Sequence, residues 1–397
     1  MGVKMYKWPP KMADLGDIVK KYIDDGNPLS ISSDTGIYSE LESKFAKIIG
    51  RKYALAVSSG TMALYSAFFS IGIEPGDEII CTSFSFHATV STALFWGANI
   101  VFCDVEPDTG NINADLIEER ITKKTKAILT NDQWGHPCNK ERILELCRKY
   151  SIKYVEDCSH AHLSKYKDNY CGSFGDVSCW SFQGSKMING GEGGILATDS
   201  FSIYERAVLL GHYSWRSINT VETNKYKPIN NTGFGLKLRM HPLAAVIILH
   251  EIEHYAEKWI VGRRDTLTYF EKQLEEKTPL KSMTKKDYVS SMGAWYGFYP
   301  RIDYSVCKKG REHFINYLKK NNIQVVIPTN GILPYLPLFK NEEFHLYQND
   351  RKNDNQVYEG AELYINSIIG FPTFSNYEYD EIDRYVAVIS KYFEENM

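Results

Sequence analysis

The stretch YALAVSSGTMALYSAFFSIG, residues 53–72, joins a short apolar run to a segment with helical spacing through a Ser-Ser-Gly-Thr turn. Similar apolar runs follow along the chain, at 78–82, 99–103, 126–130, 152–156, 178–182 and 194–198. Helical patterns separate most of these runs, and the runs are too uniformly apolar to alternate between core and solvent. The pattern therefore predicts an α/β fold whose mostly parallel central sheet is flanked by helices on both faces.

Four segments are expected from this pattern. Residues 1–50 are predicted to form helices packed on the large domain, and residues 51–240 that large α/β domain itself. Apolar residues at three- and four-residue spacing predict one long connecting helix over 241–275. Residues 276–397 are predicted to form a smaller C-terminal α+β domain, with strands at 293–302 and 323–329.

Composition narrows the function classes. The 397 residues carry a net charge of −3, with a pI near 6.4, which does not favour nucleic acid or an anionic membrane as a partner. No apolar run is long enough to span a membrane and the start lacks a signal-peptide core, so a cytoplasmic protein is expected. The eight cysteines form no CxxC pair, which predicts neither disulfides nor a metal site.

Ligands of parallel sheets bind outside the carboxyl ends of the strands, so the residues that follow each apolar run are the candidates for chemistry. Gly60 and Thr61 lie where a strand leads into a helix. A helix start with glycine and hydroxyl groups suits a phosphate, although a Ser or Thr there also serves as a simple helix cap.

Two further strand ends carry titratable groups. Asp157 and His160 follow the run at 152–156, and Lys186 follows the run at 178–182, within SFQGSKMINGGEGG (181–194). Each has an ordinary alternative: the aspartate can cap a turn, the histidine can be structural, and the lysine can be a solvated turn residue.

One cofactor needs all of these parts at once. Pyridoxal phosphate requires a lysine for a Schiff base, an acid on its pyridine nitrogen, an aromatic ring against its face and a phosphate cradle. Lys186 and Asp157 can supply the amine and the acid, and Phe86 can stack on the ring. Gly60, Thr61 and Ser181 can hold the phosphate.

The order of these motifs resembles the DegT/DnrJ/EryC1/StrS family of pyridoxal-phosphate-dependent sugar aminotransferases. The resemblance extends from about residue 30 to the end of the chain. It rests on an ordered series of motifs: SGT (59–61), GDEII (76–80), SFSFHAT (83–89), EDCSHAH (156–162), GSFGD (172–176), SF with Lys186, GEGG (191–194) and GLKLRMHPLAA (235–245). The family has the type I aminotransferase fold.

The resemblance implies a role for each matched residue. Lys186 would be the Schiff-base lysine and proton shuttle, Asp157 the pyridinium partner and His160 a neighbour of the ring. Members are typically homodimers with shared active sites, and the segment that contains Lys237 would reach the cofactor of the partner. Phe86 would stack on the ring, with Gly60, Thr61 and Ser181 at the phosphate.

Three departures from the family pattern stand out. Many members have Asn where this chain has Lys237, and glycine where it has Leu163. Residues 132–135, Asp-Gln-Trp-Gly, replace a common His-Leu-Tyr-Gly. The changes at Leu163 and at 132–135 concern the substrate side rather than the cofactor, whereas a lysine at 237 can still meet the phosphate as a point charge.

The function implied is transfer of an amino group from L-glutamate or L-glutamine to a keto sugar, one linked to a nucleotide and used in surface-glycan or natural-product biosynthesis. His212, Arg216 and Arg239 are candidates for contacts with a diphosphate. A keto-cyclitol (scyllo-inosose type) aminotransferase or an aminohydroxybenzoate-type synthase is the alternative. A sugar dehydratase, whose relatives replace the lysine by histidine, and a non-catalytic regulatory protein are disfavoured by the intact Lys186 and Asp157.

Overall fold

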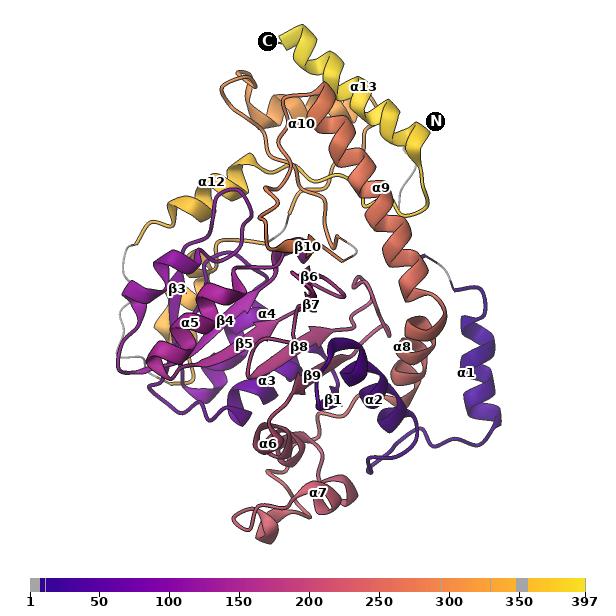
Figure 1. Ribbon diagram of the computed structural model, residues 1–397, viewed down its shortest axis with the longest axis vertical. Coiled ribbons are helices and arrows are strands. Elements are labelled where there is room, and N and C mark those ends of the chain that lie inside the picture. Colours follow the sequence, from indigo (N-terminus) through magenta and orange to yellow (C-terminus); the bar gives the residue numbers. More distant parts are fainter. Residues whose placement is uncertain (1–7, 11, 294, 329, 348–355, 397) are drawn as a thin grey trace.

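The computed structural model describes residues 8–10, 12–293, 295–328, 330–347 and 356–396, so the chain start that lacks a signal-peptide core lies mostly outside the described residues. A seven-stranded sheet forms its centre, in the order β1-β9-β8-β5-β4-β2-β3 (Figure 1). The strands are β1 (Tyr53–Val57), β2 (Glu78–Thr82), β3 (Asn99–Cys103), β4 (Thr125–Asn131), β5 (Lys153–Asp157), β8 (Val177–Ser181) and β9 (Gly194–Thr198).

The sheet is mostly parallel, which confirms the predicted fold class. Neighbouring strands from β8 through β5, β4 and β2 to β3 pair in parallel, whereas β9 pairs antiparallel with both β1 and β8. The chain reverses between β8 and β9, because Phe182 and Gly193 at the two ends of the connecting loop are hydrogen-bonded to each other and continue the antiparallel pairing. Every predicted strand of this sheet begins and ends within one residue of the observed one.

Helices cover both faces of the sheet, as the uniformly apolar strands predict. In β1, Leu55 and Val57 face a core shared with helix α3 (Gly60–Ser70), while Ala54 and Ala56 face a second core. The second core includes α2 (Ile37–Ile49) and α8 (Pro242–His254). The remaining helices of at least four residues are α1 (Leu15–Asp24), α4 (Ala88–Ser91), α5 (Lys140–Tyr150), α6 (Phe201–Gly211), α7 (Trp215–Thr220), α9 (Ala256–Lys277), α10 (Gly310–Lys320), α11 (Pro337–Lys340), α12 (Glu359–Ser367) and α13 (Tyr379–Asn396).

The segment 241–275, predicted as one long helix, is instead two helices that meet at Tyr255. The backbone of Tyr255 leaves helical geometry, with φ −127° and ψ −39°, so α8 ends there and α9 begins. The Tyr255 hydroxyl donates a hydrogen bond of 2.6 Å to Asp14, which precedes α1. Helix α9 then leads away from the sheet to α10 and α13 (Figure 1).

The two C-terminal strands predicted at 293–302 and 323–329 are isolated bridges over their described residues. Phe298 bridges Phe371, and Val326 bridges Gly370. Pro300 and Pro328 lie in these segments, and proline supplies no N–H group to extend a ladder. The proposed division of the chain into a large and a smaller domain remains a prediction.

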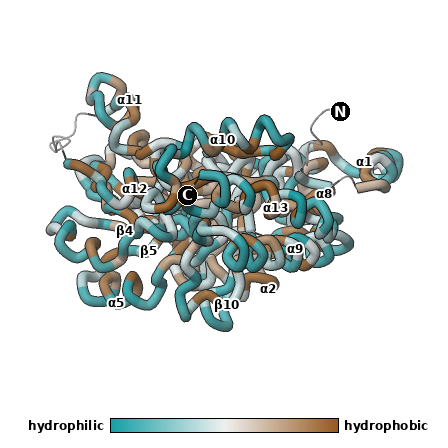
Figure 2. Tube along the Cα trace, turned by 90° about the horizontal axis from the view of Figure 1, so that it is seen from above, coloured by the Kyte–Doolittle hydropathy of each residue, from teal (hydrophilic) through white to brown (hydrophobic). Residues whose placement is uncertain are grey.

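Hydropathy follows this layered arrangement. Viewed from above, hydrophilic turns predominate on the outer helices α5 and α10, while α13 alternates between hydrophobic and hydrophilic residues along its length (Figure 2). The buried residues of α13 include Ile382, Val386 and Ile389, one helical turn apart, which turn towards the core with α9. Among the described helices, none combines the length and the apolar character that crossing a membrane requires.

Close backbone contacts join the turn after β1 to the β8–β9 hairpin. A Cβ atom built on Gly194 would lie 2.2 Å from the carbonyl carbon of Ser59, and one on Gly60 would lie 2.6 Å from the Cβ of Ser181. Backbone atoms at these distances leave no room for a side chain. Glycine is therefore required at both positions for the turn and the hairpin to touch.

Gly194→Ala is expected to lower the free energy of unfolding by at least about 1–3 kcal/mol, because the added methyl group must push the Ser59 backbone away. Gly184→Ala is the matched control, since its Cβ would meet its nearest atom, the Gly191 carbonyl oxygen, at 3.7 Å. Thermal or urea unfolding compares the two variants. Equal free energies of unfolding for the two variants would contradict the close contact between Gly194 and the Ser59 backbone.

Candidate active site

A cavity of about 640 Å³ opens at the carboxyl ends of the parallel strands. The loops after β1, β2, β4, β5 and β8 line it, together with six residues from the C-terminal part of the chain: Tyr296, Tyr299, Val326, Ile327, Pro328 and Asn330. Seven of the predicted site residues share this cavity: Gly60, Thr61, Phe86, Asp157, His160, Ser181 and Lys186.

The start of α3 forms a cradle for an anion. Ser59 caps the helix: its hydroxyl accepts the Met62 amide at 3.1 Å and its carbonyl accepts the Ala63 amide at 3.0 Å. Helical geometry leaves the amides of Gly60 and Thr61 free to bind a ligand. The hydroxyl groups of Thr61 and Ser181 line the same part of the cavity, so the cradle suits a phosphate.

Asp157 lies at the end of β5 and is only 6% exposed. Its Oδ2 accepts a hydrogen bond from the Thr89 hydroxyl at 2.8 Å, and its Oδ1 accepts the Ser159 amide at 3.1 Å. The Ser85 hydroxyl lies 2.8 Å from that of Thr89. This chain of hydroxyl groups orients the carboxylate, which keeps further acceptor capacity for a cation in the cavity.

Lys186 lies in the loop that joins β8 to β9. The base of the loop is closed by the Phe182 amide, which donates to the Gly193 carbonyl at 2.8 Å, and the Lys186 amide donates to Gln183 at 2.7 Å. The Ile188 amide donates to Nδ1 of His162 at 3.1 Å. These bonds fix the backbone on both sides of the lysine.

The loop is also held from outside. The indole N–H of Trp8 donates to the Lys186 carbonyl at 2.9 Å. The Glu251 carboxyl, on α8, accepts both the backbone amide and the side-chain amide of Asn189, at 3.2 and 3.1 Å. Burial raises the pKa of Glu251 to about 8, although the Asn189 hydrogen bond acts against it. This carboxyl is therefore largely protonated at neutral pH.

Both histidines of the HAH motif are neutral. Burial lowers the pKa of His160 well below its ordinary value, and the charge of Lys186 adds to this effect. Burial, with Lys186, lowers the pKa of His162 to about 3. A neutral His162 can accept the Ile188 amide, while the buried Nδ1 of His160 has no partner among the described residues.

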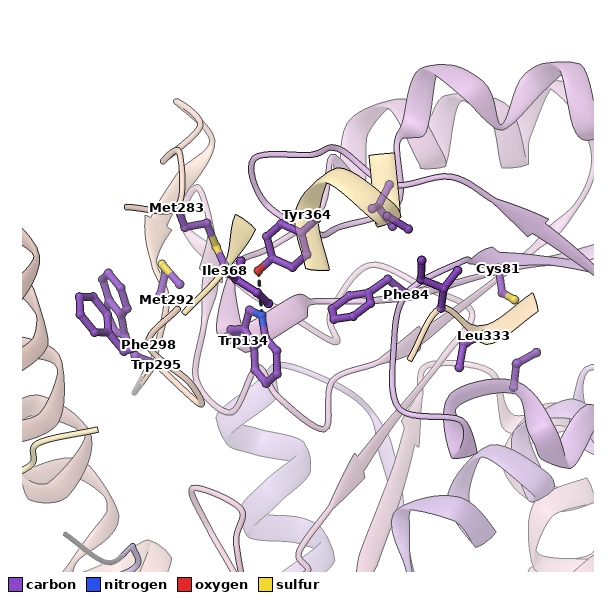
Figure 3. Close-up of a cluster of buried hydrophobic side chains, with 14 of the residues drawn as sticks. Cys81, Phe84, Trp134, Met283, Met292, Trp295, Phe298, Leu333, Tyr364 and Ile368 are labelled. Atoms are coloured by element: carbon purple, nitrogen blue, oxygen red, sulfur yellow. Dashed lines mark hydrogen bonds between the residues drawn. The ribbon is translucent and has the colours of Figure 1, made fainter. Parts of the chain in front are cut away.

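Aromatic rings form one wall of the cavity. Tyr296 stacks on His160, with ring centroids 4.0 Å apart, and Trp134 stacks on His160 at 5.3 Å. Trp134 has a left-handed backbone, with φ 56°, and its indole N–H donates to the Tyr364 hydroxyl at 2.9 Å (Figure 3). Trp134 therefore links the cavity to the core under α12.

Asp132, the first residue of the Asp-Gln-Trp-Gly departure at 132–135, has a structural role. Lys140 lies 2.7 Å from Asp132 and 3.0 Å from Glu156, and all three are buried. Burial raises the pKa of Glu156, but Lys140 and Arg51 outweigh it and hold that pKa below its usual value. The ammonium group of Lys140 contacts the carboxylates of both Asp132 and Glu156. These two ion pairs fix the backbone beside Trp134 and Asp157.

Leu163, where the family pattern has glycine, keeps the glycine-like conformation. Its φ is +57°, in the left-handed region that glycine adopts most readily. The turn after the HAH motif is thus retained. The left-handed conformation is less favourable for Leu163 than it would be for glycine.

The other four predicted residues do not line the cavity. Arg216 is buried and forms an ion pair with Glu42 at 2.7 Å, so its guanidinium is already occupied. His212 is also buried. Both side chains lie outside the described lining of the cavity, so contact of His212 or Arg216 with a diphosphate stays a prediction.

Lys237 and Arg239 lie on a segment beside the phosphate cradle. The Ser58 amide donates to the Leu238 carbonyl at 2.7 Å, and Arg239 bridges Val57. Arg239 donates to the Ile31 carbonyl at 2.7 Å, whereas the side chain of Lys237 is exposed. Lys237 is therefore free to meet another molecule.

Sequence reasoning missed several residues of the site. Thr89 belongs to the quoted SFSFHAT motif and could have been identified as a hydroxyl facing Asp157. Tyr296, Tyr299 and Trp8 come from distant segments with no recognisable motif. Their positions depend on tertiary packing, which a single sequence does not display.

These residues fit pyridoxal phosphate. Gly60 leaves an open cradle with two free amides, Asp157 is oriented and buried for the pyridine nitrogen, and Lys186 supplies an amine. Phe86 is 51% exposed, which leaves its face open to a flat ring. On the other side, His160 offers an unpartnered buried nitrogen.

Comparison with known proteins agrees with the site. The model of the DegT/DnrJ/EryC1/StrS aminotransferase family matches residues 32–390. A GDP-perosamine synthase from Escherichia coli O157:H7 is 34% identical over 256 residues, covering 64% of this chain and 68% of that protein. A putative L-glutamine:3-amino-2,3-dideoxy-scyllo-inosose aminotransferase from Micromonospora echinospora is 28% identical, covering 63% of this chain and 58% of that protein.

A solved structure extends the likeness to the whole fold. The aminotransferase from Psychrobacter cryohalolentis superposes with a TM-score of 0.86 at 24% identity, covering 99% of this chain and 100% of that one. The architecture and the cavity define the class of pyridoxal-phosphate-dependent aminotransferases. The chain belongs to the DegT/DnrJ/EryC1/StrS family of sugar aminotransferases, which confirms the resemblance and the predicted cofactor.

The raised pKa of Glu251 predicts a pH-dependent stability. Its folded pKa, about 8, lies above its ordinary value of 4.5, so its contribution to stability is complete below pH 4.5 and is lost as the pH rises through 8. Glu251→Gln cannot ionise. We expect the variant to exceed the wild type by more than about 1 kcal/mol at pH 8.5 and to match it near pH 5.

Thermal unfolding at the two pH values tests this expectation. Glu253→Gln, an exposed position on the same helix, is the control and should show no such difference. A Glu251→Gln variant whose advantage did not grow with pH would show that this carboxyl is ionised in the folded protein.

Proposed function

We propose that this enzyme transfers an amino group from L-glutamate or L-glutamine to a keto sugar carried on a nucleotide. The observation that carries the proposal is the convergence of Lys186, Asp157 and the cradle at Gly60 on one cavity. The similarity to a GDP-perosamine synthase supports a nucleotide-linked sugar as the acceptor. The product would be an amino sugar for glycan or natural-product synthesis.

Each residue has a stated task in this proposal. Pyridoxal phosphate, when bound, supplies an electron sink for the carbon that loses its proton. Lys186 holds the cofactor and moves the proton, while Asp157, oriented by Thr89, keeps the ring nitrogen protonated. The amides of Gly60 and Thr61 and the hydroxyl of Ser181 bind the phosphate, and Phe86 and His160 confine the ring.

A keto-cyclitol is the second candidate acceptor. The relative named as a putative scyllo-inosose-type aminotransferase supports it. Along the described lining of the cavity, Lys186 is the single Lys or Arg side chain, and the aromatic wall suits a neutral ring. A nucleotide diphosphate would therefore need cations from outside this cavity.

A second copy of the chain can supply such a cation. We infer a homodimer in which Lys237 of one subunit lies near the cofactor phosphate of the other. Lys237 is exposed and borders the phosphate cradle of its own chain, and Phe234 and Leu236 beside it are 47% and 38% exposed. Exposed apolar residues beside a lysine are suited to an interface.

The visible absorbance of the protein with pyridoxal phosphate tests the proposed function. We expect a lysine-dependent band in the wild type and none in Lys186→Ala, with bleaching by either glutamate or glutamine. The bleached protein then serves to screen keto sugars and keto-cyclitols for return of the band. A band that no donor bleaches would favour the regulatory or dehydratase alternatives, and the absence of a band would refute the role of Lys186.

Mixed dimers test the placement of Lys237. Lys237→Glu is expected to weaken cofactor binding about tenfold, or about 1.4 kcal/mol, by removing a cation near the phosphate. When Lys186→Ala and Lys237→Glu chains are mixed, hybrid dimers contain one site with both lysines intact. Wild-type affinity in that site supports sharing between subunits. If the mixture shows only the weakened affinity, Lys237 acts within its own chain or not at all.

A further inference from the structure

The aromatic ring of Tyr296 covers the amine of Lys186. The Lys186 Nζ lies over the Tyr296 ring, 4.3 Å from its centroid. The hydroxyl of Tyr296 lies 3.2 Å from that of Ser185, the residue next to the lysine. The Tyr296 ring also stacks on the ring of His160, which belongs to the same cavity wall.

The backbone holds Tyr296 in this position. Its amide donates to the Trp134 carbonyl at 3.0 Å, and its carbonyl accepts a hydrogen bond from Nη2 of Arg263 at 2.9 Å. With both backbone groups bonded and the ring stacked on His160, the phenol has a defined place beside the amine. These contacts would not be required if the Tyr296 ring only shielded the lysine from solvent.

Arg263 brings a second positive charge to the same place. It lies in α9, is 1% exposed, and its guanidinium stacks over the Trp8 ring at 4.5 Å. No carboxylate pairs with it among the described contacts, and burial lowers its pKa to about 9. Trp8 also binds the Lys186 carbonyl, so one indole joins Arg263 to the lysine loop.

Charged and titratable groups from several elements face Tyr296. Among the described residues these are Lys186 from the β8–β9 loop, Arg263 from α9, the neutral His160 after β5, and the neighbouring Tyr299. Burial raises the pKa of Tyr296, but the charge of Lys186, hydrogen bonds from Ser185 and Lys186, and the charge of Arg263 lower it overall. Burial raises the pKa of Tyr299.

We propose that Tyr296 is a further catalytic residue, which exchanges a proton with the Lys186 amine. The phenolate oxygen takes one proton from the ammonium group, giving a neutral amine and a neutral phenol, and the reverse step returns it. No other reactant is needed, and the total charge does not change. Only the neutral amine is a nucleophile. The inference rests on the proposed role of Lys186 as the lysine that holds the cofactor.

Tyr296→Phe tests the inference because it keeps the ring over Lys186 and removes only the hydroxyl. After pyridoxal phosphate is added to the cofactor-free protein, the visible band is expected to form about 10- to 100-fold more slowly. In the loaded protein, the midpoint of the pH titration of that band should fall by about one pH unit or more, because the nitrogen of Lys186 loses a proton acceptor. Tyr304→Phe, at an exposed tyrosine outside this cavity, is the matched control and should change neither value.

A Phe variant with the wild-type rate and midpoint would overturn the proposal and leave Tyr296 as a packing residue. Thermal unfolding checks that the variant is folded. If it is not, 3-fluorotyrosine at position 296 replaces it, since this change lowers the pKa of the phenol with little change in volume. A shift in the midpoint of the pH titration of the visible band then supports the proposal, and an unchanged midpoint overturns it. Absence of a lysine-dependent band in the wild type would instead refute the proposed function.

Discussion

The site depends on one constraint: the turn that cradles the phosphate and the hairpin that carries Lys186 must touch through their backbones. Gly60 and Gly194 make that contact possible, since a methyl group at either position would overlap the opposite chain. The contact sets the separation between the anion cradle and the amine before any ligand is present. The enzyme therefore meets its cofactor with the two anchoring points already spaced.

The loop that carries Lys186 has no strand ladder to hold it, so side chains from several other segments fix its backbone. His162, Asn189 with Glu251, and Trp8 each hold a different part of it. Two of these supports are titratable groups kept neutral by burial. Neutral partners fix the backbone of the loop without placing a charge beside the amine.

The sequence predicted those features that depend on local pattern. Strands buried on both faces appear as apolar runs, which is why the predicted strands agree with the observed ones to within a residue. Lys186 and Asp157 were found because they follow such runs. The break at Tyr255 was missed because helical spacing continues through it. Tyr255 contacts Asp14, which lies 241 residues away along the chain, and a local pattern does not display such a contact. The ion pair of Arg216 was missed for the same reason, since its partner Glu42 is 174 residues away.

The strand order has a consequence for how the protein is made. β1 lies at the edge of the sheet and its one partner there is β9, so the strand at residues 53–57 finds no neighbour until residue 198 has left the ribosome. At about 5–20 residues per second, synthesis of the intervening chain takes roughly 7–28 s. During that time a fully apolar strand and the amphipathic helix before it are exposed in the nascent chain. Shielding by a chaperone is thus most needed before β9 emerges, and the contact of the phosphate cradle with the β8–β9 hairpin forms only after that point.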